Sequence, residues 1–367
     1  MPLERGSKNY YSIIQGEISM KHQTEIYASP GNKILAVDYL KGFSIFTIAL
    51  MHLLDRMSAV PGIIHTFSAI GGTGVHVFFV CSGIGLYTSY IKHKTSYIEF
   101  IKKRFFKIYI PYIVVVFVSF FCPWLYYGDS RVTALLSHVF LFKMFSPMYE
   151  SSFGAPFWFI STLFQLYALF IPMCRIKAKL NNNKIFMCLF GGISIFWWII
   201  CYWLGIGGIR IWGSFCLQYI WEFALGFILA DLFFVGKKYI LNNYLLFASA
   251  VLGIGIQSFL ALTSDMLKVF NDVPALVGYA SLALLFSNIP VIKKLCHKMS
   301  VFSFEFYLLH NLFFVTVFHW MVPVGIFLQC VVGIVAMGIA LGGAYLFNKI
   351  INSISNYKVS ISNPSCK

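Results

Sequence analysis

Two ionisable residues, Lys41 and His52, lie in the first apolar segment of the chain, "LKGFSIFTIALMH". On an α-helix, a separation of 11 residues puts them within roughly 20° on one face and about 16 Å apart along the axis. Asp38 lies one turn before Lys41 and Asp55 one turn after His52, at spacings that allow pairing. Because an imidazole can accept a proton at neutral pH, acid-base chemistry at His52 is one interpretation of this pattern.

A structural role is the alternative interpretation of these four residues. Asp38 and Lys41 would then be interfacial side chains that extend to water, and His52 would be a packing histidine near the other surface. Ionisable groups at bilayer depth are nevertheless costly and usually face the bundle interior or a watery cavity. Each is therefore a candidate functional residue.

The composition of the chain explains why a bilayer is the relevant solvent. Of 367 residues, 59% are hydrophobic and only 11% are charged, whereas soluble domains carry about 25% charged residues. A helix needs about 20 apolar residues to span a bilayer. We therefore predict an all-α, polytopic membrane bundle of about ten transmembrane helices.

One membrane domain accounts for most of the chain. We expect a cytoplasmic arm at 1–33, the membrane domain at 34–347 and a cytoplasmic tail at 348–367. The outer stretch 128–155 contains "VTALLSHVFLFKMF", which is apolar but too short to span, so we expect it to be interfacial or re-entrant. The predicted spans are 34–54, 71–91, 108–127, 156–174, 185–204, 212–234, 244–263, 273–291, 301–320 and 324–347.

The net charge of +15 follows the topology. With both termini in the cytoplasm, 22 Lys and Arg residues lie in inner segments and 5 in outer loops. This asymmetry obeys the positive-inside rule. The charge therefore indicates orientation in a membrane, and we predict no nucleic-acid partner.

The second and third spans each carry a polar motif. "GGTGVHVFFVCSG" contains small residues, among them Ser82 and Gly83, that allow close approach of a helix or a ligand. "FIKKRFFKIYIPY" contains Lys103, Arg104 and Lys107, of which the last two share a helical face at a spacing suited to phosphates. The alternatives are helix packing for the glycines and a positive-inside anchor for the basic residues.

Later spans add further polar residues with weaker patterns. Trp158 opens "FWFISTLFQLYALFIP" and fits an interfacial aromatic belt. Glu305 and His310 in "FEFYLLHN" are about 140° apart on a helix, so spacing alone does not make them partners. Glu222 and Asp231 fall on opposite faces of their helix. The nine cysteines lack metal-ligand spacing, and we predict no metal site.

The series "VDYLKGFSIFTIALMH", "GGTGVHVFFVCSG", "KKRFFKIYIPY", "FWFISTLFQLYALFIP" and "FEFYLLHN" resembles the membrane acyltransferase-3 family of bacterial O-acyltransferases over about residues 34–347. The resemblance implies transfer of an acyl group, usually acetyl from cytoplasmic acetyl-CoA, to a hydroxyl of a surface or exported glycan. It also implies a multi-pass protein of the bacterial inner or plasma membrane. Its partners would be membrane lipid, a glycan or lipid-linked sugar acceptor and other polysaccharide biosynthesis proteins.

The resemblance also suggests roles for individual residues. His52 falls on a position thought to be catalytic in the family, Lys41 on that of an arginine, and Asp55 would orient His52. The donor would be held by Arg104, Lys107, Lys103, Ser82 and Gly83, and the acceptor would be contacted by Trp158, His310 and Glu305. His52 would act as general base on the sugar hydroxyl, with a transient acyl-histidine as the alternative.

Three departures from the family pattern bear on these roles. Lysines replace two arginines at 41 and 107, which keeps the charge but loses the bidentate fork. Leu163 stands where many members have a glutamate. We expect no soluble hydrolase-like domain after the membrane domain, unlike in some relatives. Two other functions remain open: an exporter or flippase of a polysaccharide or its lipid-linked precursor, and a non-catalytic assembly partner.

Overall fold

Long helices make up most of the structure, a computed structural model that describes residues 23–26, 35–126, 130–234 and 239–362. This confirms the all-α prediction, and every predicted span overlaps a long helix. Most of the predicted arm 1–33 and the end of the tail lie outside the described residues. The long helices are α2 (Leu35–Leu54), α4 (Gly74–Lys92), α5 (Tyr97–Phe120), α7 (Trp158–Leu180), α8 (Asn183–Trp203), α10 (Cys216–Phe234), α11 (Asn243–Thr263), α12 (Asp272–Phe286), α14 (Ser303–Met321) and α15 (Ile326–Ser362).

Shorter elements connect these helices. They are α3 (Gly62–Ser68), α6 (Arg131–Val139), α9 (Arg210–Gly213) and α13 (Pro290–Ser300), with 3₁₀ turns η1 (Ala69–Thr73), η2 (Pro123–Leu125), η3 (Lys143–Phe145), η4 (Pro147–Tyr149), η5 (Ala155–Phe157) and η6 (Leu267–Phe270). The last helix, α15, runs past the predicted end of the membrane domain at 347, so the expected tail begins as a continuation of this helix.

The number of membrane crossings differs from the prediction. Among the described residues, seven helical segments are long and apolar enough to cross a membrane, and an eighth is added if the bent pair α12 and α13 forms one span. The expectation of about ten spans is therefore not confirmed. Helices α5 and α14 are not among these segments. The first half of α5 carries several charged side chains, and α14 contains Glu305, His310 and His319.

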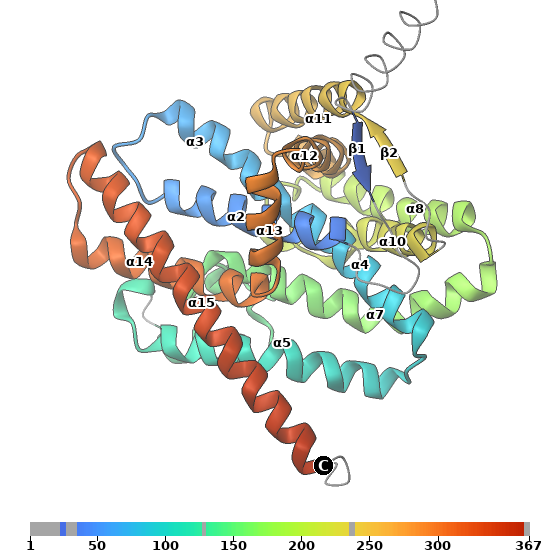
Figure 1. Cartoon of the computed structure of the whole chain (residues 1–367), viewed down its shortest axis with the longest axis horizontal. Coiled ribbons are helices and arrows are strands. Elements are labelled where there is room, and N and C mark those ends of the chain that lie inside the picture. Colours follow the sequence, from blue (N-terminus) through green and yellow to red (C-terminus); the bar gives the residue numbers. More distant parts are fainter. Residues whose placement is uncertain (1–22, 27–34, 127–129, 235–238, 363–367) are drawn as a thin grey trace, which may run out of the picture.

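The bend between α12 and α13 brings a short helix across the first span. The two helices meet at 116°, and Pro290 opens α13 after an extended Ile289, as expected for a residue that cannot continue a preceding helix. Helix α13 crosses α2 in Figure 1. A Cβ atom on Gly42 would lie 1.8 Å from the carbonyl oxygen of Cys296, so only glycine allows this approach of α2 to α13.

A small sheet ties part of the N-terminal arm to the bundle, which the sequence did not predict. Strand β1 (Gln23–Ile26) pairs antiparallel with β2 (Tyr239–Asn242). The Thr24 hydroxyl donates to Asn243 Oδ1 at 2.7 Å and accepts a hydrogen bond from Asn288 Nδ2 at 2.9 Å. The arm was predicted to be cytoplasmic, and the sheet joins part of it to the segment that leads into α11.

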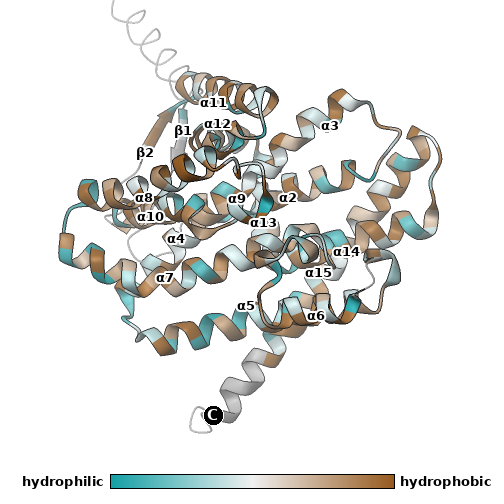
Figure 2. Ribbon diagram, turned by 180° about the vertical axis from the view of Figure 1, so that it is seen from behind, coloured by the Kyte–Doolittle hydropathy of each residue, from teal (hydrophilic) through white to brown (hydrophobic). Residues whose placement is uncertain are grey.

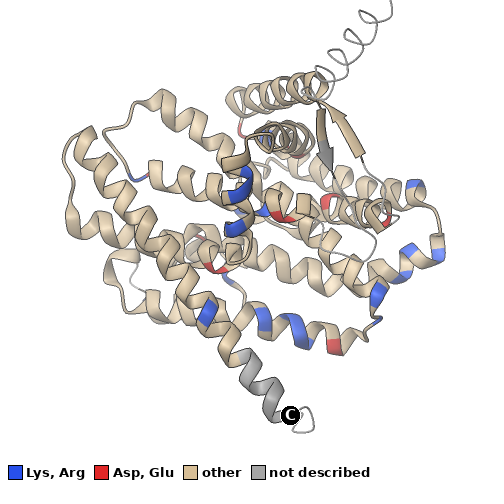
Figure 3. Ribbon diagram, in the orientation of Figure 1, with Lys and Arg blue, Asp and Glu red and all other residues tan. Residues whose placement is uncertain are grey.

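The distribution of polar residues agrees with a membrane bundle. Brown, hydrophobic residues predominate along the long helices in Figure 2. In Figure 3 the blue basic residues gather on α13, on the start of α5 and around the connection between α7 and α8, while the end of the molecule that carries α3 has few. This is the asymmetry that the positive-inside rule requires.

The outer stretch predicted to be interfacial does not span. Its helix α6 has 9 residues, and its exposed side chains include Val132 and Phe140. The opposite face is held by the buried His138, whose Nδ1 lies 2.6 Å from Tyr112 Oη and whose Nε2 lies 2.9 Å from Ser152 Oγ. One face is therefore fixed to the bundle and the other is apolar and exposed, which suits a membrane interface.

Candidate active site

A pair of histidines lies where α2 meets α14. The rings of His52 and His310 are stacked, with centroids 5.3 Å apart and an interplanar angle of 28°. The side chain of His52 is 21% exposed, whereas His310 is completely buried. The buried His310 ring therefore packs against one side of the partly exposed His52 ring. The sequence identified both residues but did not predict that they meet.

The hydrogen bonds of His310 indicate its tautomer. Its Nδ1 lies 2.7 Å from the carbonyl oxygen of Tyr307 and 3.2 Å from that of Phe306. A carbonyl oxygen only accepts, so Nδ1 carries the proton and donates it. The Nε2 atom then bears a lone pair, and it is buried without a hydrogen-bond partner among the described residues. The ring is fixed in orientation by its own backbone.

Asp55, which was predicted to orient His52, lies near it but is not hydrogen-bonded to it. Its Oδ2 atom is 3.8 Å from His52 Nδ1, which is beyond hydrogen-bonding distance. Asp55 follows the end of α2, and its burial raises the pKa of its carboxyl group above the usual range. In this geometry Asp55 can act on His52 through its charge, and orientation by a direct hydrogen bond remains a prediction.

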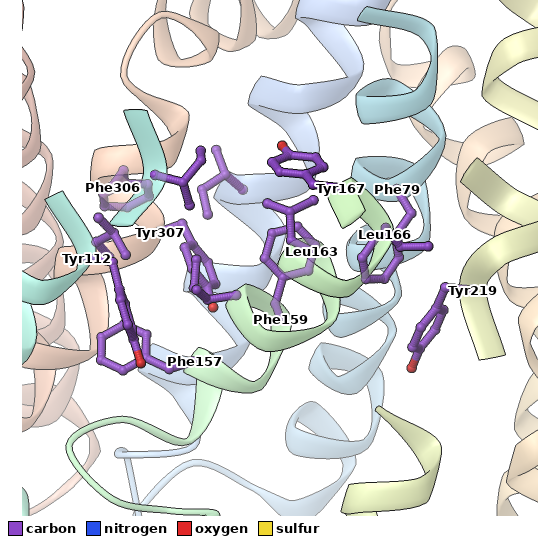
Figure 4. Close-up of a cluster of buried hydrophobic side chains, with 14 of the residues drawn as sticks. Phe79, Tyr112, Phe157, Phe159, Leu163, Leu166, Tyr167, Tyr219, Phe306 and Tyr307 are labelled. Atoms are coloured by element: carbon purple, nitrogen blue, oxygen red, sulfur yellow. The ribbon is translucent and has the colours of Figure 1, made fainter. Parts of the chain in front are cut away.

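Packing between α7 and α14 fixes the position of His310. Figure 4 shows Phe159 and Leu163 of α7 beside Tyr307 of α14, and the rings of Phe159 and Tyr307 have centroids 5.4 Å apart. The Tyr307 hydroxyl donates to the carbonyl oxygen of Pro156. The hydrophobic core thus holds the turn of α14 that carries His310. Leu163, which replaces a family glutamate, is buried in this core.

Basic residues from two helices gather toward the end of the bundle that was predicted to be cytoplasmic. The charges of Lys41 on α2 and of Lys103 and Arg104 on α5 all act on Lys107, as does the carboxylate of Glu305 at the start of α14. Lys103 and Lys107 are exposed, and Arg104 is half-buried. The structure therefore brings Lys41, which the sequence placed in a different span, to the predicted phosphate-binding residues.

Arg104 is directed into the protein. Its guanidinium group lies 5.7 Å from the centroid of the Phe100 ring, and its Nε is buried without a hydrogen-bond partner among the described residues. Its charge also acts on Tyr167, whose hydroxyl forms a hydrogen bond with Ser82. Ser82 is thus linked to the basic cluster through Tyr167, and its role near the donor stays a prediction.

Gly83 has a different environment. A Cβ atom at this position would lie 2.3 Å from the carbonyl oxygen of Phe223 on α10. Close packing of α4 against α10 accounts for this glycine, which was one of the two interpretations of its motif. Its role in ligand binding stays a prediction.

Lysines of α13 add to the positive charge at this end of the bundle. From the sequence they were interpreted only as residues that set the orientation in the membrane. Lys293, Lys294 and Lys298 line an open hollow together with His297. Helix α13 packs on α2 beside Lys41, because Cys296 contacts Gly42. The amphipathic spacing of these lysines was visible in the sequence, but the bend that turns α13 across α2 was not.

Trp158 lies on the other side of the histidine pair, toward the outer surface. Arg210 lies over its ring, 5.7 Å from the centroid, and Arg210 Nε is 4.0 Å from Glu150 Oε1. Arg210 is also close enough to His52 for its charge to act on the imidazole. An aromatic face, a guanidinium and a carboxylate beside His52 can contact a polar ring such as a sugar.

Helix α14 connects the two ends of this arrangement. Glu305, near the basic cluster, and His310, beside His52, are five residues apart and therefore about 7.5 Å apart along the helix axis. Glu305 and His310 are about 140° apart around the helix, so α14 links the basic cluster to the histidine pair through its backbone and does not present one polar face. The arrangement can hold an anionic group at one end and accept a proton at the other.

Comparison with known protein families gives one match. Residues 34–349 match the acyltransferase domain family. No curated protein and no solved structure matches the chain. The matched region contains both histidines, the basic cluster and the helices that position them. The chain therefore belongs to the membrane acyltransferase-3 family and is a multi-pass membrane acyltransferase.

Proposed function

We propose that the protein transfers an acyl group, in the first instance acetyl, from cytoplasmic acyl-CoA to a hydroxyl of a cell-surface or exported glycan or its lipid-linked precursor. The observation that carries this proposal is the presence of two separate groups of residues, a basic cluster and a histidine pair, that are both on helices α2 and α14 or beside them. The basic cluster of Lys41, Arg104 and Lys107 suits an anionic donor, and the pair of His52 and His310 suits a hydroxyl acceptor.

The donor is held by charge. The phosphates of CoA bind the basic cluster from the cytoplasm, with Arg104 as the residue able to form two parallel hydrogen bonds and the lysines as point charges. The buried Arg104 Nε has no hydrogen-bond partner among the described residues, and it would donate to such a ligand once the side chain turned toward it. The acyl end of the donor then lies along α14 toward His310.

The acceptor hydroxyl loses its proton to His52. The hydroxyl oxygen forms a bond with the thioester carbonyl carbon, the carbon–sulfur bond breaks, and the proton accepted by the imidazole is returned to the leaving thiolate. The buried ring of His310, fixed by its hydrogen bonds to Tyr307 and Phe306, holds the imidazole of His52 in position by stacking. His310 is thus a positioning residue.

The acceptor class and the exporter alternative are tested together in the bacterium. Mass spectrometry of surface glycans from cells with and without the gene should show loss of an ester-linked acyl group on a polymer of normal amount. Loss of the surface polymer, with unmodified precursor accumulating inside the cell, would contradict the proposal and favour an exporter. Loss of neither would exclude both functions for that glycan.

A further inference from the structure

Two acidic side chains and a histidine, none of them part of the proposed active site, meet inside the bundle. His76 on α4, Glu222 on α10 and Asp272 on α12 each offer one ligand atom, and these atoms all lie within 4.8 Å of one another. Glu222 is completely buried, Asp272 is 4% exposed and the side chain of His76 is 13% exposed. The cluster joins three helices whose sequences are far apart.

The charge of this cluster is not balanced by a basic side chain. His76 Nδ1 lies 2.6 Å from Glu222 Oε1, and Asp272 Oδ2 accepts a hydrogen bond from Gln218 Nε2 at 2.9 Å. Among the described residues, no Lys or Arg pairs with either carboxylate. Two carboxylates in a dry interior are strongly unfavourable unless a cation or protons neutralise them.

A second observation points to a missing ligand. The other carboxylate oxygen of Glu222, Oε2, is buried and has no hydrogen-bond partner in the part of the chain that the structure describes, and the same holds for Oε1 of the neighbouring Gln218. Buried carboxylate oxygens normally accept hydrogen bonds or bind a metal. The free oxygen belongs to the carboxylate that already contacts His76, so it adds a donor atom at the cluster.

We propose that His76, Glu222 and Asp272 bind a divalent transition metal ion such as Zn²⁺. One imidazole nitrogen with two carboxylate oxygens is a ligand set that suits this class of ion, and a fourth position is left for water or Gln218 Oε1. The prediction of no metal site was based on the spacing of the cysteines, and these three ligands lie far apart in the sequence. Asp231, with which Glu222 was compared, pairs instead with Lys177 at 2.8 Å.

The geometry requires only side-chain adjustment. Tetrahedral ligands at about 2.1 Å from Zn²⁺ are about 3.4 Å from one another. The distance of 2.6 Å between His76 Nδ1 and Glu222 Oε1 would have to lengthen. Any ligand atoms that are up to 4.8 Å apart would have to move closer together. Support for the ligands is already present, because Gln218 holds Asp272 and the Tyr219 ring lies 5.7 Å from that of His76. A bound ion would fasten α4 to α10 and α12.

The test uses the full-length protein purified in lipid nanodiscs and treated with a chelator. Titration with Zn²⁺ alone should give one ion per chain by elemental analysis and raise the melting temperature, while Mg²⁺ should do neither. Co²⁺ should give a visible ligand-field spectrum that Zn²⁺ abolishes. These measurements use the wild-type protein, so they do not depend on the folding of any variant. Absence of stoichiometric Zn²⁺ would overturn the proposal and would indicate that protons, not a metal ion, neutralise the two carboxylates.

Variants assign the ligands. His76→Gln, Glu222→Gln and Asp272→Asn should each weaken Zn²⁺ binding by about tenfold or more, since loss of an outer partner alone weakens it by about 10- to 100-fold. Asp265→Asn is the control, because Asp265 is an exposed carboxylate that pairs with Lys268. Wild-type affinity in all three ligand variants would overturn the assignment.

Discussion

The imidazole of His310 lies against that of His52, with ring centroids 5.3 Å apart, although the two residues belong to the first and penultimate long helices. One ring is buried and hydrogen-bonded to its own helix, and the other is partly exposed. We therefore propose that His52 contacts substrate and that His310 fixes the position of the His52 ring. The predictions below follow from it and from the packing around it.

Replacing His310 should slow turnover more than it weakens donor binding. The variant His310→Gln removes the stacked ring, so we expect kcat to fall about tenfold or more while KM for acyl-CoA changes little. Steady-state kinetics with varied donor give both values. His319→Gln is the control on the same helix, because His319 stacks on Trp124 near the far end of α14. A rise in KM alone would contradict the positioning role.

Replacing Arg104 should weaken donor binding. Hydrogen bonds to charged groups contribute about 1.5–3 kcal/mol, so Arg104→Gln should raise KM for acyl-CoA by roughly 10- to 100-fold. The effect of Lys107→Gln should be smaller and more sensitive to salt, since its charge is exposed. Lys102→Gln, an exposed lysine on the same helix, is the control. An unchanged KM in Arg104→Gln would place the donor elsewhere.

Much of this arrangement could be predicted because membrane helices have strong local patterns. The position of each long helix, the shared face of Lys41 and His52 and the basic start of α5 follow from apolar runs and helical periodicity. The contact between His52 and His310 could not, since it depends on how α2 and α14 are offset. The turn of α13 across α2 and the β1–β2 pairing also arise from contacts distant in sequence.

Two glycines in α4 provide a matched test of the helix packing. A Cβ atom on Gly83 would lie 2.3 Å from Phe223 O, whereas one on Gly85 would meet nothing within 4 Å. We expect Gly83→Ala to lower stability by about 1–3 kcal/mol through overpacking, and Gly85→Ala to raise it by about 0.5–1 kcal/mol through helix propensity. Thermal unfolding in the same detergent measures both. Equal shifts in the two variants would show that α4 and α10 are not packed this closely.

The buried His138 should make the outer segment sensitive to acid. Burial, and secondarily the charge of Lys143, lowers the pKa of His138 well below its usual value. The unfolded chain therefore binds a proton below about pH 6.5 that the folded chain excludes. Stability should be full above that pH and fall by up to about 1.4 kcal/mol per pH unit below it.

The measurement for this segment is the melting temperature at pH 7.5 and at pH 5.5 for the wild type and His138→Gln. The variant loses hydrogen bonds of His138, so it should be less stable than the wild type at pH 7.5. Because glutamine does not titrate, the variant should lose less stability than the wild type when the pH falls to 5.5. A pH dependence identical in the two proteins would mean that His138 is not excluded from protonation in the folded state.

The central claim is that His52 accepts the proton of the acceptor hydroxyl, and acyl transfer itself tests it most directly. Protein in vesicles is supplied with radiolabelled acetyl-CoA and the glycan that mass spectrometry identifies, and ester-linked label is counted. For His52→Ala, at unchanged protein level, we predict a loss of about 10²- to 10⁴-fold, the contribution typical of general acid-base catalysis. Transfer at the wild-type rate in this variant would contradict the role assigned to His52.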